Sequence, residues 1–373
     1  MKYRNVLFID NHRWAQFHFR GKVMASLLAA GYDVTAAAPD SSYIADDNSV
    51  PGVKQVSLGL DRTSTGIVSN VKTFLEIFKI IRQRENCLVF LFTIKPILWG
   101  ALACCLLHRE YVAFFAGVTD MIRQDSCKGK FFCWVLHWLL RGAKEVIVLN
   151  EEDCLLLKRK KVASEKQLFV LRGGEGVDLE KYRPEKIFDR HGSGFIFILI
   201  ARLLWSKGIK EYINAAEKIK KKYPKCSFLL CGEFDTFHPD AVPESYIRTA
   251  ELQGIIEYRG RINDVIAQLK EIDCFVLPSY YNEGMNRSLM EALALGKIII
   301  TTDHKGCREM VKNGENGILI PVQDSEALYL AMERVLMMSG REREKMEYNS
   351  RQLAEDIFDV NYVIQHYHSL LEH

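Results

Sequence analysis

The sequence predicts an α/β protein of two domains, each built on a parallel sheet with helices on both faces. Short, wholly apolar segments alternate with helical patterns, as in a sheet that is buried on both sides. The alternation stops at a charged stretch with proline and glycine, residues 183–194, and then starts again. The length of 373 residues exceeds one ordinary core and suits two. Two such halves joined by a linker would hold a ligand in the cleft between them.

In the first half, the apolar segments predict strands and the amphipathic ones helices. Expected strands cover residues 5–9, 34–37, 88–92, 111–115 and 146–149, with a helix over 21–30 closed by Gly31 and an apolar helix over 94–107.

In the second half, the same alternation predicts strands over 195–200, 227–231, 255–258, 274–277, 298–301 and 317–320, and helices over 208–223, 265–271 and 286–295. Residues 341–373 have a helical, amphipathic pattern. We therefore expect domains over 1–183 and 184–350, with a terminal helix, 351–373, that packs back on the first domain.

Composition excludes several classes of protein. The net charge of +3 gives no indication of nucleic-acid binding. Ten cysteines form no C-x-x-C pair, which favours buried thiols in a reducing cytosol. The first apolar run, MKYRNVLFID, is too short for a signal peptide, and no stretch offers about 20 uninterrupted apolar residues. The sequence predicts a cytoplasmic protein.

A basic turn follows the first strand of the second half. Its sequence is ARLLWSKG at 201–208, with Arg202 and Lys207 five residues apart and Gly208 opening a helix. Cations and backbone amides at a strand-to-helix turn suit a diphosphate. The alternative is a solvated basic turn, and the turn alone does not decide between them.

A second motif, PSYYNEGMNRSLMEALALG at 278–296, runs from a strand end through a polar loop into a helix. It places Glu283 in the loop and Glu291 about one turn into the helix. Carboxylates accept hydrogen bonds from hydroxyls and helix N-terminal amides hold anions, so the motif suits a sugar nucleotide. The alternative makes Glu291 a surface residue and Glu283 a cap.

Several such motifs in order resemble the family 4 retaining glycosyltransferases, whose GT-B fold has two Rossmann-like domains facing each other across a cleft. Besides these two motifs, the resemblance includes Gly232, Gly260 with Arg261, and the run TTDHKGCRE at 301–309 followed by NGENG. Such a set in order is a specific signal. The resemblance implies that Arg202 and Lys207 hold the donor diphosphate, that Glu283 binds hydroxyls of the sugar, and that Glu291 binds the ribose. It further implies donor contacts from Gly232, Arg261, Ile262, Gly284, Met285, Asn286 and Leu289.

The first half departs from the family pattern. The usual small glycine loop after the first strand is replaced by NHRW at 11–14, and the usual histidine after the fourth strand is missing from FFAGVTD at 114–120. His18 is the substitute candidate for a catalytic contact with the sugar, against a purely structural role. The segment FHFR, residues 17–20, resembles a loop that leads into a helix near the acceptor, which makes Arg20 an acceptor candidate.

The segment KGKFFCWVLHWLLRGAK at 128–144 is an apolar helix with basic flanks and tryptophans. Such a helix suits an anionic membrane surface, and the alternative is a buried helix with a solvated basic end. The expected membrane or acceptor residues are Lys128, Lys130, Trp134, Trp138 and Arg141.

The closest family likeness is to bacterial enzymes that extend a sugar on an undecaprenyl-diphosphate carrier. It implies a UDP-hexose or UDP-N-acetylhexosamine donor and a lipid-linked saccharide acceptor, at the inner face of the cell membrane. No cofactor or metal is expected, since cationic groups can stabilise the leaving diphosphate and the chain has no Asp-x-Asp. The alternatives are a nucleotide-sugar epimerase of the same fold and a non-catalytic nucleotide-sugar-binding protein.

Overall fold

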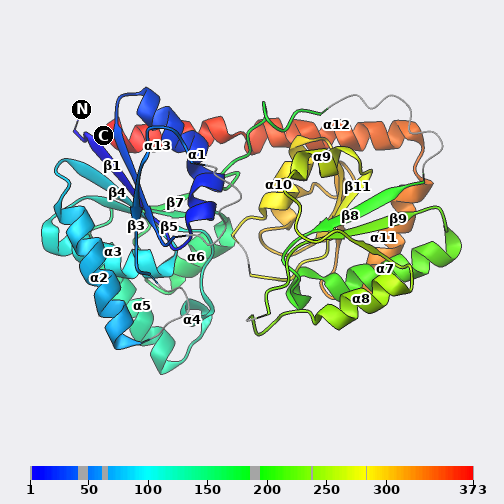
Figure 1. Ribbon diagram of the computed structural model, residues 1–373, viewed down its shortest axis with the longest axis horizontal. Coiled ribbons are helices and arrows are strands. Elements are labelled where there is room, and N and C mark those ends of the chain that lie inside the picture. Colours follow the sequence, from blue (N-terminus) through cyan, green and yellow to red (C-terminus); the bar gives the residue numbers. More distant parts are fainter. Residues whose placement is uncertain are drawn as a thin grey trace. The chain divides into compact units, whose positions relative to one another are not determined.

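The computed structural model describes residues 2–40, 49–60, 66–184, 194–236, 238–282 and 284–372. The chain forms two compact units (Figure 1). Unit 1 contains Met1–Gly176 and Val360–His373, and unit 2 contains Val177–Asp359. These division points do not coincide with the expected boundaries at residues 183 and 350. Tyr182 belongs to the core of unit 2, and the whole helix that precedes residue 360 lies in unit 2.

Unit 1 has a seven-stranded parallel sheet in the order β3-β2-β1-β4-β5-β6-β7. Its strands are β1 (Asn5–Ile9), β2 (Asp33–Ala38), β3 (Lys54–Ser57), β4 (Cys87–Phe92), β5 (Tyr111–Phe115), β6 (Glu145–Val148) and β7 (Leu168–Val170). Its helices are α1 (Arg13–Ala29), α2 (Ile67–Arg82), α3 (Ile94–Leu107), α4 (Asp120–Arg123), α5 (Cys127–Leu140), α6 (Glu151–Arg159) and α13 (Val360–Glu372).

Helices cover both faces of this sheet. Helices α1 and α13 pack together on one face, and α2, α3 and α5 cover the other (Figure 1). On the α13 face, Tyr367 is fully buried and its ring stacks on Phe8 and Phe90, with ring centroids 6.1 and 4.8 Å apart. The last helix is therefore part of the core of unit 1.

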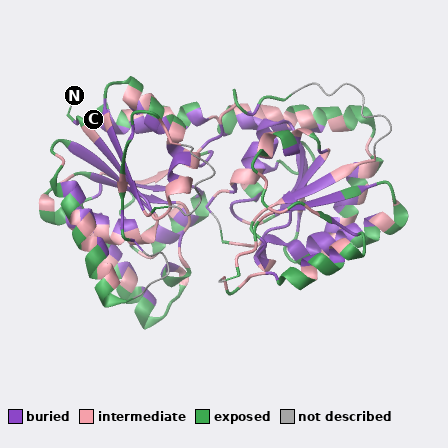
Figure 2. Cartoon of the chain, in the orientation of Figure 1, coloured by how far each residue is buried: buried purple, intermediate pink, exposed green. Residues whose placement is uncertain are grey.

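Unit 2 has a six-stranded parallel sheet in the order β10-β9-β8-β11-β12-β13. Its strands are β8 (Ile196–Ile200), β9 (Ser227–Cys231), β10 (Glu257–Tyr258), β11 (Cys274–Leu277), β12 (Ile298–Thr302) and β13 (Gly317–Ile320). Its helices are α7 (Ile209–Lys222), α8 (Glu244–Leu252), α9 (Val265–Lys270), α10 (Arg287–Ala294), α11 (Ser325–Met337) and α12 (Gly340–Ile357), with short 3₁₀ turns at Trp205–Lys207 and Arg308–Met310. In both units the inner strands of the sheet form the buried centre (Figure 2).

The α/β class and the two parallel sheets are confirmed, and several element bounds are corrected. The first helix begins at Arg13, because the His12 side chain caps it by accepting a hydrogen bond from the Ala15 amide at 3.3 Å. Residues 17–20 therefore lie inside a helix. The expected strand 255–258 is reduced to two residues, and residues 341–373 form two helices. Among the described residues, no helix combines the length and apolar character needed to cross a membrane.

Candidate functional site

The two motifs of the second half meet at the carboxyl edge of the unit 2 sheet. The turn after β8 and the loop after β11 are joined by the Tyr280 amide and the Ser279 hydroxyl, which donate to the Ser206 carbonyl at 2.8 and 3.2 Å. Gly208 has φ +77°, and a side chain there would collide with the Pro278 carbonyl. Glycine is thus required for the close approach of the two loops.

Lys207 and Arg202 converge on one aromatic ring. The Lys207 Nζ and the Arg202 guanidinium lie 4.9 and 5.6 Å from the centroid of Tyr281. Lys207 is only 5% exposed, and burial lowers the pKa of its ammonium to about 7, with a smaller contribution from the Arg202 charge. Arg202 is half-exposed and pairs with Asp235 at 3.3 Å. The alternative of a solvated basic turn is therefore wrong for Lys207, because its side chain is buried.

Glu291 is buried rather than a surface residue of α10. It is 4% exposed, and its Oε1 accepts hydrogen bonds from the Tyr182 hydroxyl at 2.8 Å and the Arg287 Nε at 2.9 Å. The surface interpretation of Glu291 is wrong. Glu283 lies outside the described residues.

The amides at the start of α10 are partly used inside the protein. The Asn286 amide donates to the Gly306 carbonyl at 3.0 Å, and the Asn286 side chain caps the helix by accepting from the Leu289 amide at 3.2 Å. Leu289 is fully buried in the core, Gly284 is buried and Met285 packs half-buried against the core. The expectation that the Asn286 amide faces a ligand is wrong, because Gly306 already accepts from it.

The turns after β9 and β10 border the same sheet edge. Gly232 has φ +153°, and a side chain there would collide with the Ala201 carbonyl. The Gly232 amide donates to the Gly260 carbonyl at 2.8 Å. Arg261 pairs with Glu233 at 3.2 Å, and Ile262 packs half-buried on the core. Because the strands are parallel, the turns after β8, β9, β10 and β11 lie along one edge of the sheet.

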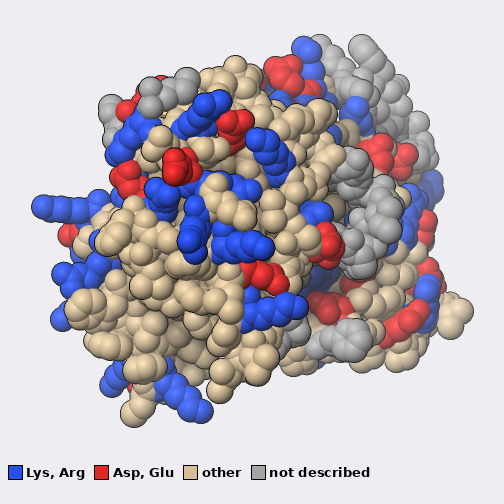
Figure 3. Space-filling view, turned by 60° about the vertical axis from the view of Figure 1, so that its left-hand side comes forward, with Lys and Arg blue, Asp and Glu red and all other residues tan. Residues whose placement is uncertain are grey.

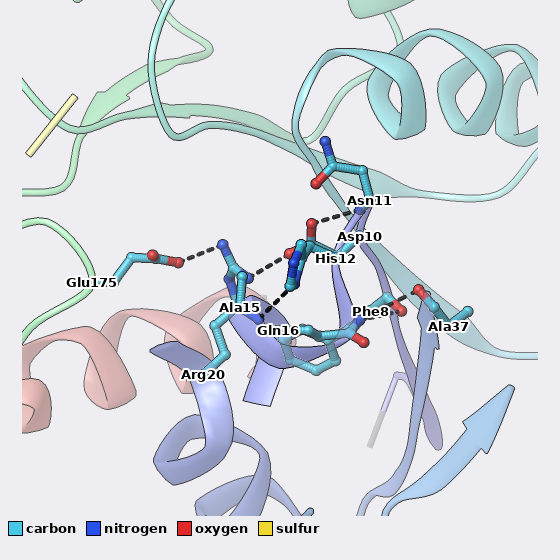
Figure 4. A network of polar contacts seen from close by, with 9 residues as sticks. All are labelled: Phe8, Asp10, Asn11, His12, Ala15, Gln16, Arg20, Ala37 and Glu175. Atoms are coloured by element: carbon cyan, nitrogen blue, oxygen red, sulfur yellow. Dashed lines mark hydrogen bonds and ion pairs between the residues drawn. The ribbon is translucent and has the colours of Figure 1, made fainter. Parts of the chain in front are cut away.

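Unit 1 places its two candidates, His18 and Arg20, on α1. His18 is half-buried on α1, and its ring stacks on Trp14 with centroids 4.3 Å apart. Arg20 is 3% exposed and binds Asp10 at 2.6 Å and Glu175 at 2.5 Å (Figure 4). Burial lowers the pKa of Arg20, but the charges of Glu175 and Asp10 outweigh it and raise the pKa. Arg20 is a buried cation held by two carboxylates, and its expected part in acceptor binding stays a prediction.

Helix α5 presents an aromatic stripe to the solvent. Phe131, Trp134 and Trp138 are 65%, 57% and 53% exposed, while Cys133, Leu136 and Leu140 on the opposite face are buried. The Arg141 guanidinium lies 4.8 Å from the ring centroid of Trp138, and Lys128 and Lys130 are exposed. The buried-helix alternative is wrong for this face.

A second exposed apolar face lies on α2, at Ile67, Val68, Val71 and Leu75. Helices α2 and α5 both pack against α3. Figure 3 shows lysine and arginine side chains next to broad uncharged areas on the face turned forward.

Sequence reasoning missed two tyrosines at the carboxyl edge of the unit 2 sheet. Tyr281 stood in the quoted loop, but nothing in its spacing indicates that its ring lies beside both cations. Tyr182 is 109 residues from Glu291, and no local signal connects them. Among the described residues, no group of three or more His, Cys, Asp or Glu side chains could hold a metal ion.

Comparison with known proteins finds similarity to glycosyltransferases. Residues 184–353 match the family described as glycosyl transferases group 1. An α-1,3-N-acetylgalactosaminyltransferase of Campylobacter jejuni, named for N,N'-diacetylbacillosaminyl-diphospho-undecaprenol, is 25% identical over 98% of this chain and 97% of its own. An Escherichia coli UDP-Gal:α-D-GlcNAc-diphosphoundecaprenol α-1,3-galactosyltransferase is 26% identical over 72% of this chain and 71% of its own.

Solved structures share the fold over the whole chain. A glycosyltransferase from Rickettsia africae has a TM-score of 0.81 at 17% identity and covers 100% of this chain and 98% of its own. Anabaena HepE in complex with UDP has a TM-score of 0.79 at 17% identity and 99% coverage of both chains. The fold is that of the GT-B glycosyltransferases.

Proposed function

We propose a specific reaction from one premise: residues 184–353 match the glycosyl transferases of group 1, and the protein is a glycosyltransferase. The proposed reaction moves a hexose or N-acetylhexosamine from a UDP-sugar to a lipid-linked, undecaprenyl-diphosphate saccharide. It retains the anomeric configuration and contributes to glycan or polysaccharide synthesis. The names of the two bacterial relatives support this choice of donor and acceptor.

The observation that carries the proposal is the pair of cations beside Tyr281. As the glycosidic bond to the nucleotide breaks, negative charge grows on the diphosphate leaving group. Lys207 and Arg202, fixed before the reaction, stabilise that charge. An anion at this place favours the protonated form of Lys207, so the donor itself completes the charge of the site.

The remaining donor contacts follow from the family pattern. Glu291 accepts from the ribose hydroxyls, Glu283 accepts from the transferred sugar, and Arg261 with Ile262 lies beside the base. Gly284 and Met285 line the diphosphate, and His18 contacts the sugar. No bound metal or other cofactor is needed in this proposal, because the cations take that role.

A nucleotide screen tests the donor. UDP and UDP-sugars are expected to raise the unfolding temperature by mass action, while GDP and ADP at equal concentration raise it less. Equal shifts with all three nucleotides, or none with UDP, would contradict the proposal. Product analysis with donor alone tests the epimerase alternative: an epimerised sugar without acceptor would replace the transferase assignment.

We further propose that unit 1 binds an anionic membrane surface, where the lipid-linked acceptor resides. Exposed tryptophans with lysine and arginine at the flanks are typical of helices at a bilayer interface. The apolar face of α2 adds a second area of the same character. The protein would then be peripheral at the inner face of the cell membrane.

Sedimentation with anionic vesicles at low salt tests the surface. The double variant Trp134→Ser with Trp138→Ser is expected to lose most of the binding. The matched control is Leu252→Ser on α8, since Leu252 is 88% exposed but lies in unit 2. No binding by the unchanged protein, or equal losses for both variants, would contradict the proposal.

A further inference from the structure

The segment that begins unit 2, residues 177–182, is firmly attached to it. The Val177 amide donates to the Phe358 carbonyl at 2.6 Å, and the Tyr182 amide donates to Asp178 at 2.8 Å. Asp178 Oδ1 also accepts from the amides of Glu180 and Lys181, at 3.1 and 3.2 Å. The segment is therefore a folded turn with a fixed end at Tyr182.

The Tyr182 side chain points from this turn to Glu291 on α10. The residue is 4% exposed, and its hydroxyl donates to Glu291 Oε1 at 2.8 Å. Burial and the Glu291 charge raise the pKa of the phenol well above its usual range, so the hydroxyl remains a donor at any physiological pH.

Two donors meet on the same carboxylate oxygen. Arg287 Nε donates to Oε1 at 2.9 Å from one turn earlier on α10, and Tyr182 approaches from outside the helix. Two bonds from different elements fix the rotation of the Glu291 side chain, which one helical neighbour alone does not.

The same turn is also attached to the far end of α10. Arg351 on α12 donates through Nη1 to the carbonyls of Tyr182 and Ala294, both at 2.7 Å. Tyr182 is thus held by its backbone while its hydroxyl holds Glu291. The fold on both sides therefore fixes the contact between Tyr182 and Glu291.

We propose that Tyr182 is a positioning residue for the donor nucleotide, holding Glu291 in the orientation that receives the ribose hydroxyls. The inference rests on the role proposed for Glu291. It assigns to the segment at the start of unit 2 a part in recognising the nucleotide, although that segment does not belong to any of the donor motifs.

Calorimetry with two nucleotides tests the inference. Tyr182→Phe is expected to weaken UDP binding about tenfold, as for loss of a hydrogen bond that orders a charged group. Binding of 2',3'-dideoxy-UDP, which lacks the ribose hydroxyls, should change less than about twofold. With UDP-sugar as substrate, KM should rise while kcat remains near its original value.

Tyr212→Phe is the matched control. Tyr212 is another fully buried tyrosine of unit 2, and its hydroxyl donates to the carbonyls of Phe197 and Leu229. The Tyr212→Phe variant should have a lower unfolding temperature. Any change in its affinity should be the same for UDP and for 2',3'-dideoxy-UDP. If Tyr182→Phe does not fold, Arg287→Gln removes the Arg287 Nε donor to Glu291 Oε1. This variant should likewise lose more affinity for UDP than for 2',3'-dideoxy-UDP.

The outcomes also distinguish this inference from the proposed function. Equal losses for both nucleotides, or no loss for either, would overturn the role of Tyr182. An unchanged protein that binds UDP and dideoxy-UDP equally would overturn it too, while leaving the donor site in place. An unchanged protein that binds neither nucleotide would overturn the proposed function itself.

Discussion

Arg20 in unit 1 and Lys207 in unit 2 are both buried near the carboxyl edge of their sheets, and these two cations have opposite electrostatics. Arg20 in unit 1 lies between Asp10 and Glu175, whose charges raise its pKa. Lys207 in unit 2 is buried to a similar degree, yet burial lowers its pKa to about 7. A buried cation with carboxylate partners stabilises the fold, whereas one with a lowered pKa gains most from an arriving anion. Burial alone therefore does not distinguish a structural charge from a functional one.

The largest effect should come from Arg20. Arg20→Met leaves two buried carboxylates without their partner, which costs about 3–5 kcal/mol of unfolding free energy. Urea denaturation measures this loss, and UDP affinity of the folded variant should be unchanged. A variant of normal stability would show that the Asp10–Arg20–Glu175 network is not what distinguishes unit 1.

The next effect should come from Lys207. Lys207→Ala is expected to lower kcat/KM for the UDP-sugar by about 10²-fold, since one cation on the leaving group is lost. Its stability should not fall as for Arg20, because removal of a poorly solvated ammonium also removes a desolvation cost. The control is Lys221→Ala, an exposed lysine of α7 paired with Glu217. Activity within a few-fold of the original would contradict the assignment.

The pH dependence of stability sharpens the comparison. Between about pH 7 and 10.5 the unfolded chain binds a proton at Lys207 that the folded chain has released. Stability attributable to this group therefore rises with pH across that window and is lost as pH falls toward 7. Denaturation at several pH values should show this slope, and Lys207→Met should lack it.

The same shift predicts proton uptake on nucleotide binding. At pH 8, the protein should take up as much as about one proton when UDP binds, because the diphosphate raises the pKa of Lys207. Calorimetry in two buffers of different ionisation enthalpy measures the uptake. Lys207→Met should bind without it, and equal uptake by both proteins would assign the proton to another group.

The smallest effect should come from metal removal. With cations at the diphosphate, EDTA treatment should change kcat/KM by less than about twofold. A large loss that Mg²⁺ restores would show that Lys207 and Arg202 do not suffice for the leaving group.

Much of the fold followed from local pattern. The strands 5–9 and 274–277 and the helix 94–107 have the predicted bounds, because buried strands and helices have distinctive apolar runs. The edge strands β3 and β7 were not predicted, since their residues are half-exposed or exposed and lack such a run.

The candidate site was predictable only where its residues are close in sequence. The turn 201–208 and the loop 278–286 were recognisable as motifs, but their contact through Gly208 was not. Tyr182 and Glu175 act on partners more than 100 residues away, so no local spacing reveals them. The burial of Arg20 likewise depends on strands and loops that assemble only in the folded unit.

The discontinuity of unit 1 has a consequence for biosynthesis. Helix α13 supplies Tyr367 to the core of unit 1, and His366 of the same helix bonds Glu145 at 2.7 Å. Unit 2 is continuous, from Val177 to Asp359. On the ribosome, the second unit can therefore complete its core before the first, which must wait with an open α13 face until synthesis has passed residue 372. Premature termination just before α13 would release a chain with one finished and one unfinished unit.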